Sequence, residues 1–168
     1  IDSLRENKVM SLKTRFGNLG NILDFDNLTE ENIYVLDSPM LTNSQFRKFK
    51  KFFSTKVKVI DCTFDIKSSL KDRIETIREE TETAVREGST CLILSDKNIS
   101  NEKASIPSIL TVGAVHSHLV KHGLRGYCSL NVECSDALDT HSFAILIGVG
   151  ATTVNPYLAI DSIYQRFD

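Results

Sequence analysis

Acidic and small polar residues stand at the ends of apolar runs in this 168-residue sequence. Such runs predict buried parallel strands, and the carboxyl ends of these strands carry the active site in α/β enzymes. An enzyme using this edge would be rich in carboxylates and could add a metal ion, whereas Lys97 is the nearest basic residue that could receive a phosphate. The residues concerned are Asp61, Asp65, Ser95, Asp96, Glu133, Ser135 and Asn155.

These polar residues have a second interpretation, in which they cap helices and order loops by hydrogen bonding. Ser135 or Asp136 in particular would cap the helix that follows them. If the edge has a function, we expect it at Asp96 and Glu133, with Asn155 as a third candidate. Such a function would be that of an independent small-molecule-binding or metal-dependent α/β module.

The histidines offer one pair with the spacing of a metal site. His118 and His122 are four residues apart and share a helix face, whereas His116 does not join them. No acidic residue joins the pair at helical spacing, so polar residues at the end of a core helix are favoured. A hydrolytic triad of Ser95 with His118 or His141 lacks the G-x-S-x-G elbow. We therefore expect no metal ligand and no catalytic residue in this chain.

Gly148 and Gly150 resemble part of a phosphate-binding loop, but their context argues against that function. Phosphate loops lead from a strand into a helix amino terminus, where free N–H groups and the helix dipole attract an anion. Here the glycines follow a predicted helix and precede a strand, and Thr153 stands where the third glycine of G-x-G-x-x-G would be. We expect a tight packing turn with a left-handed glycine cap.

The elements that must position these residues begin with a helix after Thr42. Gln45 completes a capping box with Thr42, and Leu41 with Phe46 forms a hydrophobic staple. Apolar runs then predict strands at 57–64, 90–96, 127–133 and 151–157. Helical periodicity predicts helices at 68–88, 106–123, 136–148 and from 158 onward.

Strands alternating with helices predict an α/β fold with a parallel sheet covered on both faces. An open doubly wound sheet and a partial (β/α)8 barrel both satisfy this pattern. Residues 1–41 are less regular and predict an arm or strap, with residues 42–168 forming a single β/α domain. Within the arm the apolar residues have only loose helical spacing, and we expect them either to pack poorly or to mediate self-association in the isolated chain: Leu4, Val9, Leu12 and Phe16.

Composition sets limits on the partners of this chain. Its 20 basic and 22 acidic residues give a net charge of -2, which supplies no broad footprint for nucleic acid. No apolar run reaches the ~20 residues that a membrane helix needs. The four cysteines form no C-x-x-C pair and predict reduced, mostly buried thiols of an intracellular protein. The sequence starts at Ile1 without a leader-like segment, as expected for a segment of a longer protein.

Several long motifs, taken in order, resemble the central domain of glutamate synthases. They cover nearly the whole chain: IDSLRENKVMSL, LDSPMLTNSQFRKF, ILSDKN, IPSILTVGAVHSHLVKHGLR, SLNVEC and HSFAILIGVGATTVNPYLA. The sequence departs from the family pattern at Val149, where a tyrosine is usual, and at His116-Ser117-His118 and Thr140-His141-Ser142, where histidines are often paired.

The resemblance implies a multidomain enzyme that makes glutamate from glutamine and 2-oxoglutarate in a bacterial cytoplasm or a plastid stroma. A glutamine amidotransferase domain would precede this segment, and a (β/α)8 domain holding FMN and a 3Fe-4S cluster would follow it. The central domain would be a rudimentary relative of the flavin barrel that connects the two. It would contribute no catalytic residue and no cofactor ligand of its own.

Overall fold

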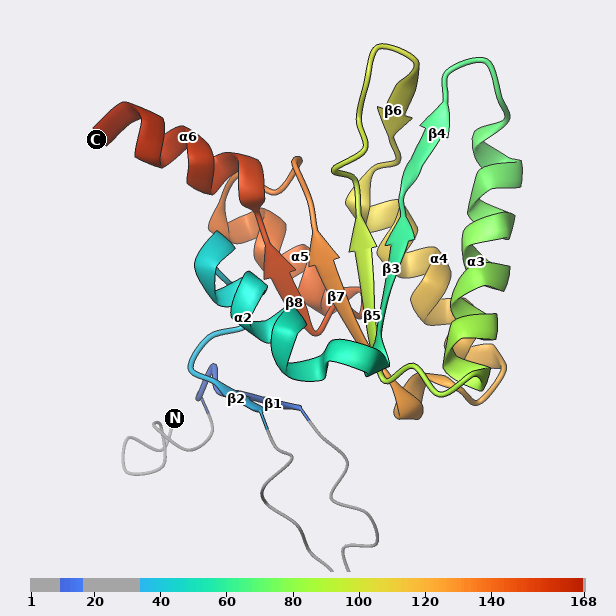
Figure 1. Cartoon of the computed structure of the whole chain (residues 1–168), viewed down its shortest axis with the longest axis horizontal. Coiled ribbons are helices and arrows are strands. Elements are labelled where there is room, and N and C mark those ends of the chain that lie inside the picture. Colours follow the sequence, from blue (N-terminus) through green and yellow to red (C-terminus); the bar gives the residue numbers. More distant parts are fainter. Residues whose placement is uncertain (1–9, 17–33, 168) are drawn as a thin grey trace, which may run out of the picture. The chain divides into compact units, whose positions relative to one another are not determined.

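A four-stranded parallel sheet forms the centre of the structure (Figure 1). Its strands follow the chain in spatial order β3-β5-β7-β8 and comprise Val57–Asp61, Cys91–Ser95, Ser129–Glu133 and Thr153–Asn155. The computed structural model describes residues 10–16 and 34–167 and divides the chain into two compact units, 1–39 and 40–168. The sheet belongs to the second unit.

The strand order decides between the two architectures that the sequence allowed. A doubly wound sheet reverses its strand order at a switch point, whereas here each strand pairs with the next one along the chain. This is the order of consecutive strands in a (β/α)8 barrel, but the described strands form an open sheet and no closed barrel. The predicted α/β fold with alternating β/α units is confirmed.

Three helices cover one face of the sheet and enclose the main core (Figure 1). They are α3 (Leu70–Arg86), α4 (Ser108–Lys121) and α5 (Thr140–Gly148). The side of α3 that faces the core is buried at Ile77, Thr81, Ala84 and Val85. Buried leucine and valine side chains of β5 and β7 contribute to the same core from the sheet: Leu92, Leu94, Leu130 and Val132.

A shorter helix, α2 (Asn43–Phe53), crosses the opposite side of the sheet (Figure 1). The predicted capping box is present, because Gln45 N–H donates to Thr42 Oγ1 at 3.3 Å and Thr42 N–H donates to Gln45 Oε1 at 2.9 Å. Phe46 and Phe49 of α2 are buried. A 3-10 turn, η3 (Ser54–Lys56), then leads directly into β3.

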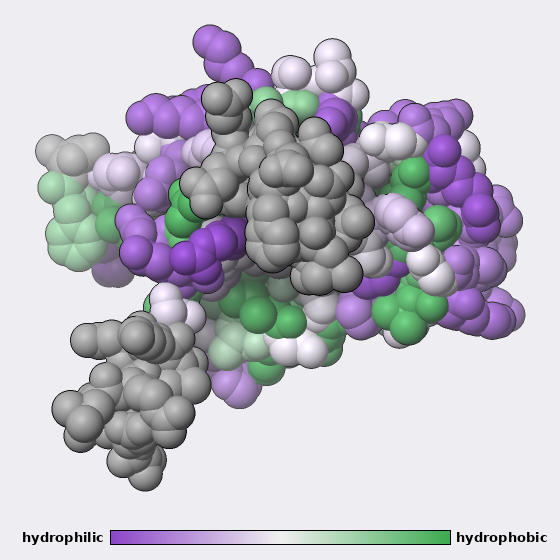
Figure 2. Space-filling view, turned by 90° about the horizontal axis from the view of Figure 1, so that it is seen from below, coloured by the Kyte–Doolittle hydropathy of each residue, from purple (hydrophilic) through white to green (hydrophobic). Residues whose placement is uncertain are grey.

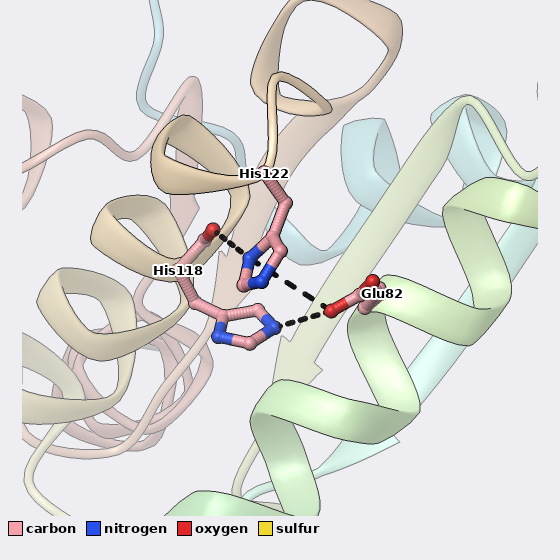
Figure 3. Close-up of side chains that lie close together, drawn as sticks. All are labelled: Glu82, His118 and His122. Atoms are coloured by element: carbon pink, nitrogen blue, oxygen red, sulfur yellow. Dashed lines mark hydrogen bonds and ion pairs between the residues drawn. The ribbon is translucent and has the colours of Figure 1, made fainter.

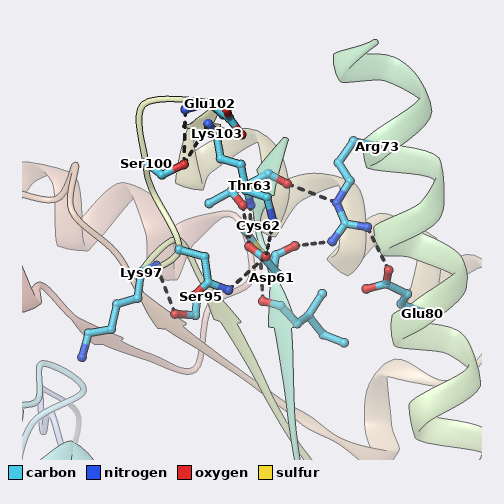
Figure 4. A network of polar contacts seen from close by, with 12 residues as sticks. Asp61, Cys62, Thr63, Arg73, Glu80, Ser95, Lys97, Ser100, Glu102 and Lys103 are labelled. Atoms are coloured by element: carbon cyan, nitrogen blue, oxygen red, sulfur yellow. Dashed lines mark hydrogen bonds and ion pairs between the residues drawn. The ribbon is translucent and has the colours of Figure 1, made fainter. Parts of the chain in front are cut away.

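The predicted strand 57–64 is divided by a turn. Residues 63–65 form β4 (Thr63–Asp65), which pairs antiparallel with β6 (Lys103–Ser105), a strand the sequence analysis did not predict. The cause lies in Asp61, whose Oδ1 accepts hydrogen bonds from Thr63 N–H at 3.0 Å and Thr63 Oγ1 at 2.7 Å. Arg73 of α3 then donates to the carbonyls of Asp61 and Thr63 and fixes the turn (Figure 4).

The third predicted helix begins later than expected. The sequence placed its start near residue 136 with Ser135 or Asp136 as the cap, but α5 begins at Thr140, and Asp139 caps it by accepting a 2.7 Å hydrogen bond from Ser142 N–H. Ser135 and Asp136 bind elsewhere, as described below. After β8 the chain ends in α6 (Tyr157–Phe167), which contains no buried residue.

The first unit contains a small antiparallel pair of strands, β1 (Thr14–Phe16) and β2 (Tyr34–Leu36), where the sequence suggested loose helical spacing. Leu12 is 67% exposed, as expected, but Phe16 is only 6% exposed, so the prediction of poor packing is wrong for Phe16. Leu4 and Val9 lie outside the described residues. None of the helices described is long and apolar enough to span a membrane.

Candidate functional site

Strand register aligns the polar residues at the carboxyl ends of the parallel strands. Asp61 is the partner of Ser95, Ser95 of Glu133, and Glu133 of Asn155. The carboxyl edge, defined here by Ser95, Asp96, Glu133 and Asn155, is therefore a continuous row as predicted. All four residues are buried.

Glu133 is held by two neighbours on the same edge. Its Oε2 accepts a 2.7 Å hydrogen bond from Ser95 Oγ, and its Oε1 lies 2.9 Å from Lys97 Nζ. The Lys97 side chain is half exposed and its Nζ also lies 5.0 Å from the centre of the Tyr157 ring. Lys97, the basic residue that the sequence analysis considered for a phosphate, therefore neutralises a buried carboxylate of its own domain.

Asp96 organises the loops that follow three strands. Its Oδ2 accepts hydrogen bonds from Ser135 N–H at 2.9 Å, from Ser135 Oγ at 2.6 Å and from Ser105 Oγ at 3.1 Å. Asp136 beside it accepts from Ser108 N–H at 2.9 Å and so caps α4, whose N-cap position is Pro107. Asp96 Oδ1 has no hydrogen-bond partner.

Asn155 connects the edge to the start of α2. Its Nδ2 donates to Leu41 O and to Asn43 Oδ1, both at 2.9 Å. The structure thus brings the three predicted candidates onto one edge but gives each a separate set of partners. The hydrogen bonds of these three side chains fit the interpretation as loop-ordering contacts, and Glu133 adds the ion pair with Lys97.

A cavity of about 10 Å³ adjoins this edge and is lined by Asp96, Glu133, Ser108, Thr111 and apolar side chains from the core. A single water molecule needs roughly this volume, so the cavity is too small for a flavin or an organic substrate. Burial raises the pKa of Tyr157 to about 12, and the charges of Asp96 and Glu133 act in the same direction. The tyrosine hydroxyl therefore stays protonated at neutral pH.

One buried polar residue behind this edge was missed by sequence analysis. Asn131, in the middle of β7, donates from Nδ2 to Leu92 O at 3.1 Å and to Ser129 Oγ at 3.0 Å, and its Oδ1 accepts from Thr153 Oγ1 at 2.7 Å. It is fully buried on the sheet face opposite the main core. A lone asparagine in an apolar run was the available signal, and in the structure its amide hydrogen-bonds to β5, β7 and β8.

Gly150 lies in a packing turn, as predicted, and Gly148 is the last residue of α5 before it. Gly150 has φ of +121° and follows the last turn of α5, where its N–H binds Ile147 O and the next N–H binds Leu146 O. This is the Schellman arrangement that glycine favours. A Cβ at Gly150 would overlap the His116 imidazole, and His116 Nδ1 in turn accepts a 3.2 Å hydrogen bond from Arg125 Nε.

A cluster at the other end of the strands joins two histidines to a carboxylate (Figure 3). His118 and His122 come from the end of α4, and Glu82 comes from α3; its Oε2 lies 2.7 Å from His118 Nε2. The sequence analysis paired the histidines but missed Glu82, because no spacing along one helix connects them. Within 10–16 and 34–167, this is the one group of three such residues placed to hold a metal ion.

The four cysteines are dispersed and buried, as predicted. Burial raises the pKa of Cys91 and of Cys134 to about 12 and also raises the pKa of Cys62 and Cys128, so all four remain neutral thiols at neutral pH. Cluster ligands are thiolates that converge on iron, and these thiols do not fit that chemistry.

Fold and site together define a β/α domain with an open parallel sheet, whose strand edge is occupied by its own side chains. Over residues 1–168 the sequence matches the family described as the glutamate synthase central domain. The chain therefore belongs to that family.

Named relatives agree with this assignment. The chain is 52% identical over 169 residues to the glutamate synthase [NADPH] large chain of Azospirillum brasilense, with 99% of this chain and 11% of the relative covered. It is 38% identical over 171 residues to the chloroplastic ferredoxin-dependent glutamate synthase of Spinacia oleracea, with 98% and 10% covered. The chain thus spans about a tenth of the length of these relatives.

Proposed function

We propose that this chain is a non-catalytic central domain of glutamate synthase that connects the glutamine amidotransferase and FMN domains of one polypeptide. The observation that carries the proposal is the state of the carboxyl edge. Each candidate residue there is buried and bound within the domain, Glu133 to Ser95 and Lys97, and Asp96 to Ser135 and Ser105. A working edge would instead leave polar groups converging on an open pocket.

The surface of α6 supports a connecting role. The helix has no buried residue, yet Leu158, Ile163, Tyr164 and Phe167 are apolar and between 47% and 80% exposed. Hydrophobic residues stand out at the end of the molecule where α6 lies (Figure 2). Helical spacing places Ile163, Tyr164 and Phe167 on one side of α6, and exposed apolar residues that lie together mark contact surfaces. We propose that α6 packs against a neighbouring domain, and that residues 1–41 act as an interdomain strap.

The parent enzyme would use FMN and a 3Fe-4S cluster held by another domain and would make glutamate from glutamine and 2-oxoglutarate. It would work in a bacterial cytoplasm or a plastid stroma. The competing function is an independent small-molecule-binding or metal-dependent module that uses the carboxyl edge. The 10 Å³ cavity beside Asp96 and Glu133 disfavours this alternative, because it leaves no room for a substrate.

Thermal unfolding of the purified chain with each small molecule in turn separates the two functions. A ligand that binds only the folded state raises its stability by RT ln(1 + [L]/Kd), which is about 2.7 kcal/mol at 100 times Kd. The connecting role predicts an unchanged Tm with millimolar FMN, 2-oxoglutarate or glutamine. A saturable rise in Tm with one of them, removed by Glu133→Gln, would establish the carboxyl edge as a binding site.

A further inference from the structure

The group formed by Glu82, His118 and His122 lies where the ends of two helices approach each other (Figure 3). Glu82 is in the last two turns of α3, His118 is in the last turn of α4, and His122 is the C-cap of α4. Helix carboxyl ends carry a partial negative charge, so this position favours a cation. Both helices lead from here into the starts of β5 and β7, far along the strands from the carboxyl edge.

The ligand atoms of the three residues lie within 4.8 Å of one another. Glu82 Oε2 is 2.7 Å from His118 Nε2 and 3.8 Å from His122 Nδ1. Two ligands at the usual distances around a tetrahedral zinc-type ion are roughly 3.3 Å apart. The 2.7 Å between Glu82 Oε2 and His118 Nε2 is shorter than that value by about 0.6 Å, so a small side-chain movement is enough for Glu82 and His118 to share an ion.

The hydrogen bonds around the group fix which atoms are free to bind. His122 Nδ1 lies 2.8 Å from His118 O, and because a carbonyl only accepts, Nδ1 carries the proton and Nε2 keeps its lone pair. This arrangement, a histidine with one ring nitrogen bound to a carbonyl and the other directed at the metal, is common among metal-binding histidines. When an ion is bound, His118 Nε2 would contact it in place of Glu82 Oε2.

The carboxylate is oriented from its other side by Arg86. Arg86 Nε donates to Glu82 Oε1 at 2.9 Å, which leaves Oε2 directed at the histidines. The Arg86 and His118 hydrogen bonds lower the pKa of Glu82, so its side chain is ionised at neutral pH. The side chains of Glu82 and His118 are 23% and 18% exposed, which leaves them reachable by an ion from solvent.

We propose that Glu82, His118 and His122 bind one divalent transition-metal ion of the zinc, cobalt or nickel class, with water completing its coordination. Two imidazoles and one carboxylate suit these ions, whereas magnesium and calcium require oxygen ligands. The ion would join α3 to α4 on the outer helical layer. This site is separate from the carboxyl edge and does not depend on the connecting function proposed above.

Cobalt(II) is the probe that tests the proposal, because its visible absorption reports nitrogen and oxygen coordination directly. The complete chain, freed of any histidine tag and treated with a chelator, is titrated with Co²⁺ at pH 7.5. We expect one saturable visible band at a ratio of one ion per chain. His122→Ala and Glu82→Gln should each weaken Co²⁺ binding by at least about tenfold.

His141→Ala is the matched control, because His141 is an exposed histidine at the start of α5 and belongs to no such group. It should bind Co²⁺ like the parent chain. Zn²⁺ at saturation should also raise the Tm of the parent and of His141→Ala, but not that of His122→Ala, and circular dichroism verifies that each variant is folded. The proposal is overturned if no saturable Co²⁺ band appears, or if the parent and His122→Ala bind Co²⁺ with equal affinity. The group would then be only an ion pair of His118 with Glu82.

Discussion

Replacing Asp96 by alanine removes the acceptor that holds together the loops after β5, β6 and β7. Three hydrogen bonds to its Oδ2 are lost, at 2.6, 2.9 and 3.1 Å. The two serine hydroxyls can rotate to other partners, but the Ser135 N–H is left without an acceptor. Hydrogen bonds to a charged group contribute about 1.5–3 kcal/mol each, and a buried orphan donor costs about 1–3 kcal/mol.

Removal of the buried carboxylate also relieves its desolvation, which offsets part of this loss. We therefore expect Asp96→Ala to lower the free energy of unfolding by about 3 kcal/mol. For a chain of this size that corresponds to a fall in Tm of about 6–12 °C. Urea denaturation followed by circular dichroism measures the change through the midpoint concentration at constant m value.

Two further variants make the measurement specific. Asp96→Asn keeps an acceptor oxygen at nearly the same place and should lose an intermediate amount of stability. Glu79→Ala removes an exposed carboxylate from the surface of α3 and should change stability by no more than about 0.5 kcal/mol. If Asp96→Ala proves as stable as Glu79→Ala, the loop-ordering role assigned to Asp96 is wrong.

Three other predictions concern the ends of helices. Gly150→Ala should cost at least about 2 kcal/mol in urea denaturation, because a side chain at φ of +121° is strained and meets His116; a neutral result would contradict the turn geometry. Thr42→Ala breaks the capping box of α2 and should cost about 1 kcal/mol by the same assay, with Thr42→Ser close to neutral. Hydrogen bonds from Ser142 lower the pKa of Asp139, so its contribution to stability is complete above about pH 4 and is lost as the pH falls through the folded pKa. Asp139→Asn keeps a helix cap that does not titrate, so the Tm of this variant should fall less than that of the parent between pH 5 and pH 3. Equal falls in Tm for the two proteins would refute this.

The features that depend on local sequence patterns were predicted correctly from the sequence. Thr42 and Gln45 form the expected capping box, and the β/α alternation gave the four parallel strands and the helices between them, because capping and periodicity depend on neighbours a few residues away. The alignment of Ser95, Glu133 and Asn155 along one edge also followed, since parallel strands in one sheet share their carboxyl ends.

The parts that sequence analysis missed depend on contacts between distant segments. Asp61 turns the chain out of the sheet, and β4 then pairs with β6, about forty residues further on. Likewise, Glu82 joins His118 only because α3 and α4 pack side by side. The spacing of residues along one helix gives no information about which residues of another helix they contact. The sequence analysis therefore identified the histidine pair but not Glu82.

The central claim is that the carboxyl edge serves structure and no chemistry. Its most direct test is the turnover of the full-length enzyme carrying Glu133→Gln, Asp96→Asn or both, expressed per folded molecule. We predict lower stability with kcat for glutamate formation within about twofold of the parent. A loss of 10²-fold or more in a correctly folded variant, the size expected for removal of a general acid or base, would contradict the account.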